Sequence, residues 1–192
     1  MSPRGRRPAG EDARAQIVEA ARAELAAKGY DGTSLRGVAR AAGVDPALVH
    51  HYFDGKAAVF AAAMEVPVDP RVVVDGILEA PDDRLGESLV RGFLHVWDTP
   101  AGRERIAALL RSAATHDDPM TLLRQFLLHE VFGRVAGRVG PQDLERRAAL
   151  VATQMIGLAF ARYVAGLPGV ADAEPDELVA AVGPVIQRYL DL

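Results

Sequence analysis

Side chains that could bind a charged ligand are concentrated in one short segment, residues 46–56. His50, His51 and Tyr52 are consecutive, and Lys56 follows shortly after them. Imidazole, phenol and ammonium groups can donate hydrogen bonds to phosphate oxygens, whereas small apolar groups can contact thymine methyl groups. Apolar residues directly precede the histidines: Pro46, Ala47 and Leu48. This combination predicts a helix surface that contacts DNA, because the N-terminal residues of a recognition helix read base edges in the major groove.

The residues before this segment predict two short helices joined by a tight turn. Thr33 and Ser34 are candidate N-caps. The helix after them has one apolar face, formed by Leu35, Val38, Ala39 and Ala42. Gly43 fits a left-handed helix end and Pro46 fits the start of the second helix, which gives a helix-turn-helix. A third helix beginning near Lys56 would add backbone N–H groups that could bind a phosphate. The same residues could also form a packed helical hairpin that binds nothing.

No residue pattern indicates an enzyme. The sequence has no Cys, which excludes disulfides, thiolate metal sites and cysteine nucleophiles. His95, His116 and His129 lack the spacing of a metal site. The segment Gly86-Glu-Ser88 lacks the second glycine of a nucleophile elbow. We therefore expect no catalytic residue, no metal and no cofactor. The alternative interpretation is a helical ligand-binding dimer, or an enzyme with a pocket between helices, that has no DNA role.

Charge is divided unevenly along the chain. The 192 residues carry a formal net charge of −4, but residues 1–56 hold nine Arg and Lys against seven Asp and Glu. A mildly basic head on an acidic body allows phosphate contact by the head only. The first nine residues include three Arg, and no apolar stretch of the kind found in a signal peptide follows them. The most apolar stretch, 148–167, contains Gln154 and Arg162, so we expect a cytoplasmic protein without a membrane span.

The whole chain is predicted to be all-α. No segment alternates like a strand, and six prolines fit the first position of a helix, where a missing N–H costs nothing: residues 46, 70, 100, 119, 141 and 175. Ten helices are expected, at about 11–28, 34–41, 46–52, 56–65, 70–79, 82–98, 101–114, 119–137, 142–166 and 176–190. The first three would form a DNA-binding head with the helix-turn-helix, and the others a helical body.

Residues 11–60 resemble the N-terminal domain of TetR/AcrR-type bacterial transcriptional regulators. The resemblance is carried by the helix and Gly-Tyr ending at 17–30, by Thr33-Ser-Leu-Arg-Gly-Val-Ala-Arg-Ala-Ala-Gly-Val44, and by Leu48-Val-His-His-Tyr-Phe-Asp-Gly-Lys56. It implies an Ω-shaped homodimer in which each helical subunit presents one recognition helix to a palindromic operator. It also implies a flexible basic arm at 1–9, a DNA-binding domain at 10–56 with a linking helix to about 66, and a ligand-binding and dimerisation domain at 67–192.

Positions that commonly contact DNA in this family are occupied here by Thr33, Arg36, Ala47, His51, Tyr52 and Lys56. His50 departs from the family pattern, which commonly has Tyr there, so the base preference of relatives does not transfer. Together with the helix pattern, the resemblance predicts a DNA-binding set of Thr33, Ser34, Arg36, Pro46, Ala47, Leu48, His50, His51, Tyr52 and Lys56.

Two further sets of residues are expected in the body. Members of the family generally bind a small inducer there, and the predicted pocket consists of Phe93, Trp97, Leu110, His116, Phe126, His129 and Met155. Each of these could instead belong to the core. The last two helices are apolar on more than one side, and a helix that is apolar nearly all round must be buried. The predicted dimer interface consists of Val151, Met155, Ile156, Ala159, Tyr163, Val182, Ile186 and Tyr189. These helices could instead close the core of the monomer.

The sequence therefore predicts a sequence-specific DNA-binding regulator, usually a repressor in this family. It would bind its operator as a homodimer and would be released by a small apolar ligand.

Overall fold

The structure is a computed structural model that describes residues 9–192 apart from residues 67 and 116. The predicted basic arm, 1–9, lies outside the described residues except for Ala9, which begins the first helix. The described residues form helices and no strand, which confirms the predicted fold class. They divide into two compact units with a boundary between Glu65 and Val66, here called unit 1 and unit 2.

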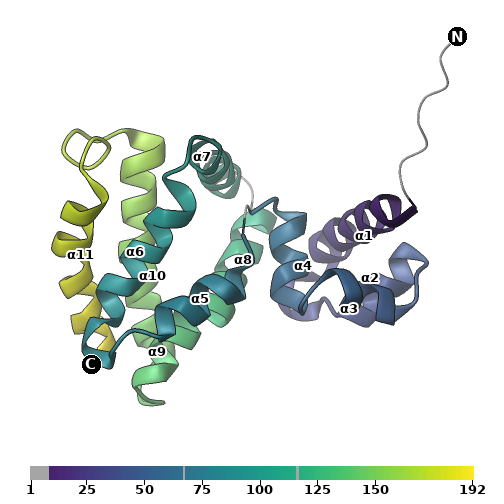
Figure 1. Cartoon of the computed structure of the whole chain (residues 1–192), viewed down its shortest axis with the longest axis horizontal. Coiled ribbons are helices and arrows are strands. Elements are labelled where there is room, and N and C mark those ends of the chain that lie inside the picture. Colours follow the sequence, from purple (N-terminus) through teal and green to yellow (C-terminus); the bar gives the residue numbers. More distant parts are fainter. Residues whose placement is uncertain (1–8, 67, 116) are drawn as a thin grey trace, which may run out of the picture. The chain divides into compact units, whose positions relative to one another are not determined.

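Unit 1 is built from four helices, shown in purple to blue in Figure 1: α1 (Ala9–Gly32), α2 (Leu35–Ala42), α3 (Pro46–Tyr52) and α4 (Lys56–Ala63). α1 packs against both α2 and α4. Gly29 interrupts α1 with a left-handed φ of 72°, which a residue without a side chain adopts readily. After this break Tyr30 turns into the core, where its ring meets Phe60 edge-on at a centroid distance of 5.2 Å.

The caps between α2 and α3 form as the sequence predicts. The Ser34 hydroxyl accepts a hydrogen bond from the Gly37 N–H at 3.1 Å, and the Asp45 carboxylate accepts one from the Ala47 N–H at 2.7 Å. Gly43 ends α2 with a φ of 67°. Each contact satisfies a backbone N–H that the helix itself leaves unpaired. The tight turn therefore has local causes.

Unit 2 holds the remaining elements: α5 (Pro70–Leu78), η1 (Asp82–Arg84), α6 (Leu85–Trp97), α7 (Pro100–Thr115), α8 (Asp117–Phe126), η2 (Leu127–Phe132), α9 (Gly133–Val139), α10 (Leu144–Phe160), η3 (Ala161–Ala165) and α11 (Pro175–Leu190). η1 is a single turn of 3₁₀-helix. η2 and η3 are π-helical stretches that continue α8 and α10 without a break. α6 and α11 lie side by side in Figure 1 and pack closely.

Two predicted helix starts are shifted in the structure. α8 begins at Asp117, so Pro119 lies inside its first turn rather than at its start. The helix expected from residue 142 begins only at Leu144. Asp143, the residue before it, has a left-handed φ of 47° and therefore does not belong to the helix. The expectation that Pro141 starts a helix is therefore wrong.

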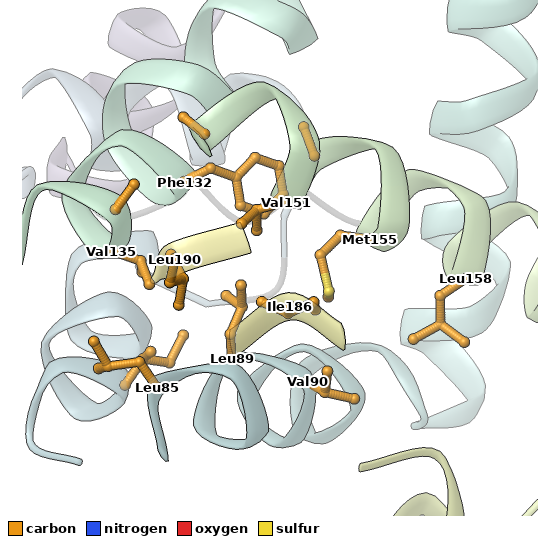
Figure 2. Close-up of a cluster of buried hydrophobic side chains, with 14 of the residues drawn as sticks. Leu85, Leu89, Val90, Phe132, Val135, Val151, Met155, Leu158, Ile186 and Leu190 are labelled. Carbon is orange, nitrogen blue, oxygen red and sulfur yellow. The ribbon is translucent and has the colours of Figure 1, made fainter. Parts of the chain in front are cut away.

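The core of unit 2 lies between α6, α9, α10 and α11 (Figure 2). Its fully buried side chains include Leu85, Leu89, Val90, Val135, Val151, Ile186 and Leu190. The α6–α11 contact is close because two glycines meet there. An added Cβ on Gly86 would lie 2.3 Å from the Gly183 carbonyl oxygen.

Arg147 joins three helices at one edge of this core. Its side chain is buried, and its guanidinium donates to the carbonyl oxygens of Leu190, at 2.9 Å, and of Gly140. These carbonyls lie at the C-terminal ends of α11 and α9, where a cation is favoured. Arg147 thus ties the first turn of α10 to both of those ends.

Candidate nucleic-acid interface

α3 is anchored on one side and open on the other. Val49 and Phe53 are 0 % and 4 % exposed in the core of unit 1. Pro46, Ala47, His50 and His51 are exposed, and Leu48 and Tyr52 are half-buried. A short helix held by two buried residues can present its other face to a groove without unfolding. The structure therefore brings these six predicted residues together on one surface.

Two aromatic rings are in contact at the C-terminal end of α3. The rings of His51 and Tyr52 meet edge-on with centroids 5.0 Å apart. Both histidines lie in the last turn of α3, and the Phe53 N–H donates to the Val49 carbonyl at 2.9 Å to close that turn. Beneath them, the Arg14 guanidinium lies 5.2 Å from the centre of the Phe53 ring. The end of α3 is thus joined to α1 through the Phe53 ring.

Lys56 lies at the start of α4. Its ammonium is 4.4 Å from the centre of the Tyr30 ring and donates to the Asp31 carbonyl at 3.3 Å. Gly55, with a φ of 91°, makes the turn that precedes it. The positive charge therefore lies beside the first backbone N–H groups of α4, and both features attract a phosphate.

The remaining predicted residues differ in their access to solvent. Arg36 and Ser34 are exposed on and before α2, although the Ser34 hydroxyl is already used as a helix cap. Thr33 is 4 % exposed, and its hydroxyl donates to the Gly29 carbonyl at 2.8 Å. Its side chain therefore joins the end of α1 to α2 and does not lie on the α3 surface. Arg40, an exposed cation in the last turn of α2, is absent from the predicted set.

In unit 2 the structure gathers only part of the predicted ligand pocket. Phe93, Trp97 and Leu110 pack in one apolar cluster, here called the aromatic cluster. Its other members are Ile106, Leu109, Leu123, Leu127, Ala159, Tyr163 and Val164. Met155 belongs to the neighbouring core, which Phe93 also touches. Phe126 is buried, and His116 lies outside the described residues.

His129 is exposed and lies outside both the aromatic cluster and the neighbouring core. His129 lies in η2, which is π-helical, so α-helical spacing does not hold between it and Phe126. Among the described residues, no group of His, Asp and Glu could hold a metal ion.

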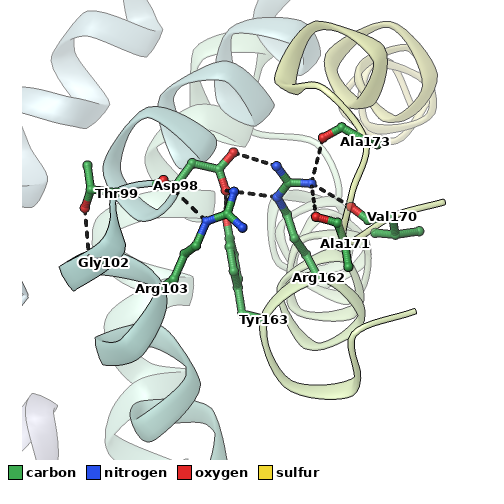
Figure 3. A network of polar contacts seen from close by, with 9 residues as sticks. All are labelled: Asp98, Thr99, Gly102, Arg103, Arg162, Tyr163, Val170, Ala171 and Ala173. Atoms are coloured by element: carbon green, nitrogen blue, oxygen red, sulfur yellow. Dashed lines mark hydrogen bonds and ion pairs between the residues drawn. The ribbon is translucent and has the colours of Figure 1, made fainter. Parts of the chain in front are cut away.

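A polar network closes one side of the aromatic cluster (Figure 3). Arg162, only 2 % exposed, forms a two-pronged ion pair with Asp98, at the end of α6. The Tyr163 hydroxyl donates to the same carboxylate at 3.0 Å, and Arg103 of α7 lies 3.1 Å from it. Arg162 also donates to three carbonyls in the loop before α11: Val170, Ala171 and Ala173.

The network changes the acidity of its members. Burial by itself would raise the pKa of Asp98, but hydrogen bonds from Arg162 and Tyr163 and the charges of Arg162 and Arg103 outweigh it, so that this pKa falls below its ordinary value. Burial, and then the neighbouring Asp98 carboxylate, raise the pKa of Tyr163. Asp98 is thus a carboxylate and Tyr163 a neutral donor at neutral pH.

The predicted dimer residues separate into buried and exposed groups. Val151, Met155, Ala159 and Ile186 are at most 2 % exposed within the subunit's own interior, which corrects their placement on a dimer face. Tyr163 belongs to the polar network, and Val182 and Tyr189 are half-buried. Ile156 is 40 % exposed. On α10 and α11, three exposed apolar residues lie outside the predicted set: Leu144, Phe160 and Val185.

The run Leu144–Ala165 is long and apolar enough to span a membrane, by length and composition alone. Two arginines in this run argue for a different role. Arg147 and Arg162 are buried, and each donates hydrogen bonds to other elements of unit 2. The run therefore packs as a core helix of this unit, with an additional exposed apolar face.

Comparisons with known proteins agree with this arrangement. The family model "Bacterial regulatory proteins, tetR family" matches residues 17–63, and "Tetracyclin repressor-like, C-terminal domain" matches residues 83–190. A TetR-family regulator from Streptomyces coelicolor A3 is 32 % identical over 98 % of this chain and 100 % of its own, with a TM-score of 0.54. No curated protein sequence matches.

Two further solved structures align with most of the chain. The fatty acid degradation regulator FadR from Bacillus halodurans is 15 % identical, over 97 % of each chain, with a TM-score of 0.50. FadR from Bacillus subtilis, solved in complex with stearoyl-CoA, is 14 % identical over 90 % of this chain and 96 % of its own, with a TM-score of 0.46.

The helix-turn-helix of unit 1 and the two family models make this chain, as a class, a DNA-binding transcription regulator. The chain belongs to the TetR family of bacterial regulators, since the C-terminal family model alone covers more than half of it.

Proposed function

We propose that the chain represses transcription as a homodimer bound to a palindromic operator and leaves DNA when a small apolar ligand binds unit 2. The observation that carries the DNA-binding part is the surface of α3, where Pro46, Ala47, His50 and His51 are exposed while Val49 is fully buried. In this proposal unit 1 is the DNA-binding domain, unit 2 binds the ligand and the second subunit, and the protein acts in the cytoplasm.

The N-terminal half of α3 would read bases. Pro46 and Ala47 have no hydrogen-bonding side chain and fit contact with thymine methyl groups. His50 and His51 would contact phosphates or base acceptors further along, and Lys56 and Arg36 would contact the backbone. Phosphate contacts fix the register of the helix, whereas base contacts give sequence preference.

A second copy of the chain would cover the exposed side of α10 and α11. Ile156 and Phe160 on α10 and Val185 on α11 are between 36 % and 48 % exposed. Gly157 is exposed beside them, with no atom within 4 Å of an added Cβ, so another helix could approach closely there. Two helices from each subunit would then form a four-helix interface, which holds two recognition helices at a fixed separation.

The ligand would act on the aromatic cluster between α6, α7 and α10. Phe93, Trp97 and Tyr163 line it with aromatic surface, and Asp98 and Arg162 close one side with polar groups. Apolar walls with a few fixed polar groups are typical of small-molecule sites. A ligand that binds one arrangement of these helices better than another would shift the separation of the recognition helices.

Selection of bound sequences from random DNA with the purified protein tests this function. We expect a palindrome whose half-sites lie one or more helical turns apart. Fluorescence anisotropy with the selected operator should show that Tyr52→Ala weakens binding while the dimer stays folded by circular dichroism. Enrichment of no sequence, with binding equal to that of random DNA, would contradict the proposal. Turnover of a small molecule without any DNA binding would favour the enzyme alternative.

A further inference from the structure

A groove between α5 and α6 in unit 2 has no role in the function proposed above. It has a volume of about 660 Å³ and is lined by residues between Val68 and Val96. Sites for small molecules commonly have volumes of roughly 300–1,000 Å³. Its apolar part consists of Val68, Val72, Val73, Ile77 and Val96. Val72 is 71 % exposed, the largest exposure among the large apolar residues that the structure describes as exposed, so this groove leaves apolar surface in water.

Two glycines shape the groove. At Gly92 on α6 an added Cβ would lie 3.1 Å from the Ile77 side chain, so this glycine lets α5 and α6 approach each other. At Gly76 on α5 an added Cβ would meet no atom within 4 Å. Glycine inside a helix is unfavourable compared with alanine. Packing within the subunit gives no reason for glycine at 76, whereas an occupant of the groove would.

Polar groups follow one edge of the groove along α6. Ser88, Arg91 and His95 recur at helical spacing and all line it. Arg91 is paired with Asp176 at 2.6 Å, but both side chains are more than half exposed, and such pairs contribute little to stability. Asp69, the one acid in the lining, caps α5 by accepting a hydrogen bond from the Arg71 N–H. The edge along α6 therefore offers a guanidinium that can exchange the Asp176 carboxylate for that of a ligand.

We propose that this groove binds an alkyl carboxylate, with the carboxylate at Arg91 and the chain over Val72, Val73 and Ile77. A guanidinium can pair with a carboxylate through two parallel hydrogen bonds. The distance along α6 from Ser88 to Val96 is about 12 Å at 1.5 Å per residue, so the groove suits a chain of medium length. This site shares no lining residue with the aromatic cluster, and it goes beyond the function proposed above.

Calorimetric titration of the full chain with decanoate, below its micelle concentration and without DNA, tests the proposal. We expect saturable binding of one decanoate per chain, and about fourfold tighter binding for each added methylene from hexanoate to decanoate. Decyltrimethylammonium, which has a similar chain and the opposite charge, should bind about tenfold or more weakly. Equal binding of the two amphiphiles, or no binding of decanoate, would overturn the proposal.

Two substitutions locate the site. Gly76→Leu fills the groove and should weaken decanoate binding at least about tenfold, since it removes the space for several methylenes. Gly137→Leu is the matched control, because Gly137 is exposed on α9 and its added Cβ would make only an ordinary contact, at 3.9 Å from Leu144. Arg91→Gln should remove the preference for decanoate over decyltrimethylammonium.

A photoreactive decanoate on the unaltered protein gives a test that does not depend on the folding of any variant. Crosslinks are expected in residues 68–96. Crosslinks confined to other peptides, or equal loss of binding in Gly76→Leu and Gly137→Leu, would overturn the proposal. None of these measurements involves an operator, so their failure would leave the DNA-binding function untouched.

Discussion

Arg162 and Asp98 lie 64 residues apart in the sequence, and the guanidinium pairs with both oxygens of the carboxylate. The Arg162 Nε–H donates to Asp98 Oδ1 at 2.9 Å, and its Nη2 donates to Oδ2 at 2.8 Å. Because the same guanidinium also holds carbonyls of the loop before α11, it ties the ends of α6 and α10 to that loop (Figure 3). One side chain thus holds the ends of α6 and α10 and the loop before α11 together.

Replacement of this arginine should destabilise unit 2. Arg162→Met keeps the apolar stem but leaves the Asp98 carboxylate with only Arg103 and Tyr163, and it leaves the loop carbonyls without their donor. We expect the free energy of unfolding to fall by about 3 kcal/mol, near the lower end of the range for breaking a buried ion pair. Urea denaturation with an unchanged slope should show this. Arg91→Met, which removes an exposed pair, should cost less than about 1 kcal/mol. Similar losses of stability in both variants would mean that the buried ion pair contributes no more than the exposed one.

The pKa of Asp98 predicts part of the acid sensitivity. This pKa lies below its ordinary value in the folded chain, so the carboxylate binds protons more readily when the chain is unfolded. Its contribution to stability is therefore complete above about pH 4 and is lost as the pH falls through the lowered pKa. Asp98→Asn should be less stable than the parent at pH 7, and the difference should shrink by pH 2. Free energies of unfolding at pH 7, 4 and 2 check this. A difference that stays constant over the whole range would show that Asp98 contributes nothing through its charge.

Much of unit 1 follows from local sequence, because its signals act over a few residues. Ser34, Gly43, Asp45 and Pro46 set the ends of α2 and α3 through contacts with their near neighbours. Burial of Val49 and Phe53 then fixes which side of α3 is open. The predicted surface could be located in this way, except that Thr33 is used to join α1 to α2.

Unit 2 was less predictable because its determinants are distant in sequence. Asp98 and Arg162 each look like ordinary surface charges until the fold brings them together. On α10, Met155 and Ile156 are both apolar, and the sequence does not tell which faces inward. The structure buries Met155 and leaves Ile156 exposed. The π-helical stretch η2, which contains the exposed His129, has no clear sequence signal.

Salt dependence can identify the phosphate contact proposed for Lys56. Lys56→Gln should weaken binding to all operator variants by a similar factor, and should lower the slope of log K against log salt by about one, because one phosphate contact is lost. Arg124→Gln removes the same charge from an exposed position of α8 and should leave the slope unchanged. Anisotropy titrations at several salt concentrations measure both slopes. An equal decrease for the two variants would attribute the effect to net charge and not to a contact.

The proposed dimer face can be tested with a single charge. Ile156→Asp places a carboxylate in the exposed apolar strip of α10, where a partner helix would have to bury it, at a cost of several kcal/mol. Sedimentation should show a monomer that binds the operator weakly. Val72→Asp makes the same change at a more exposed position on α5 and should leave the dimer intact. A stable Ile156→Asp dimer would place the interface on another surface.

Replacement by alanine is expected to change stability in opposite directions at two glycines, Gly86 and Gly76. Gly86 meets α11 at backbone level, with Gly183 O and Gln187 N only 2.3 Å and 2.7 Å from an added Cβ, so Gly86→Ala must push α6 and α11 apart. We expect the free energy of unfolding to fall by about 1–3 kcal/mol, as for other overpacked cores. Gly76 has open space at the same position, so Gly76→Ala should stabilise its helix by about 0.5–1 kcal/mol. Thermal unfolding of the two variants beside the parent measures both effects. If both alanines raise the melting temperature, the close α6–α11 contact does not control stability, because helix propensity alone would then account for the two results.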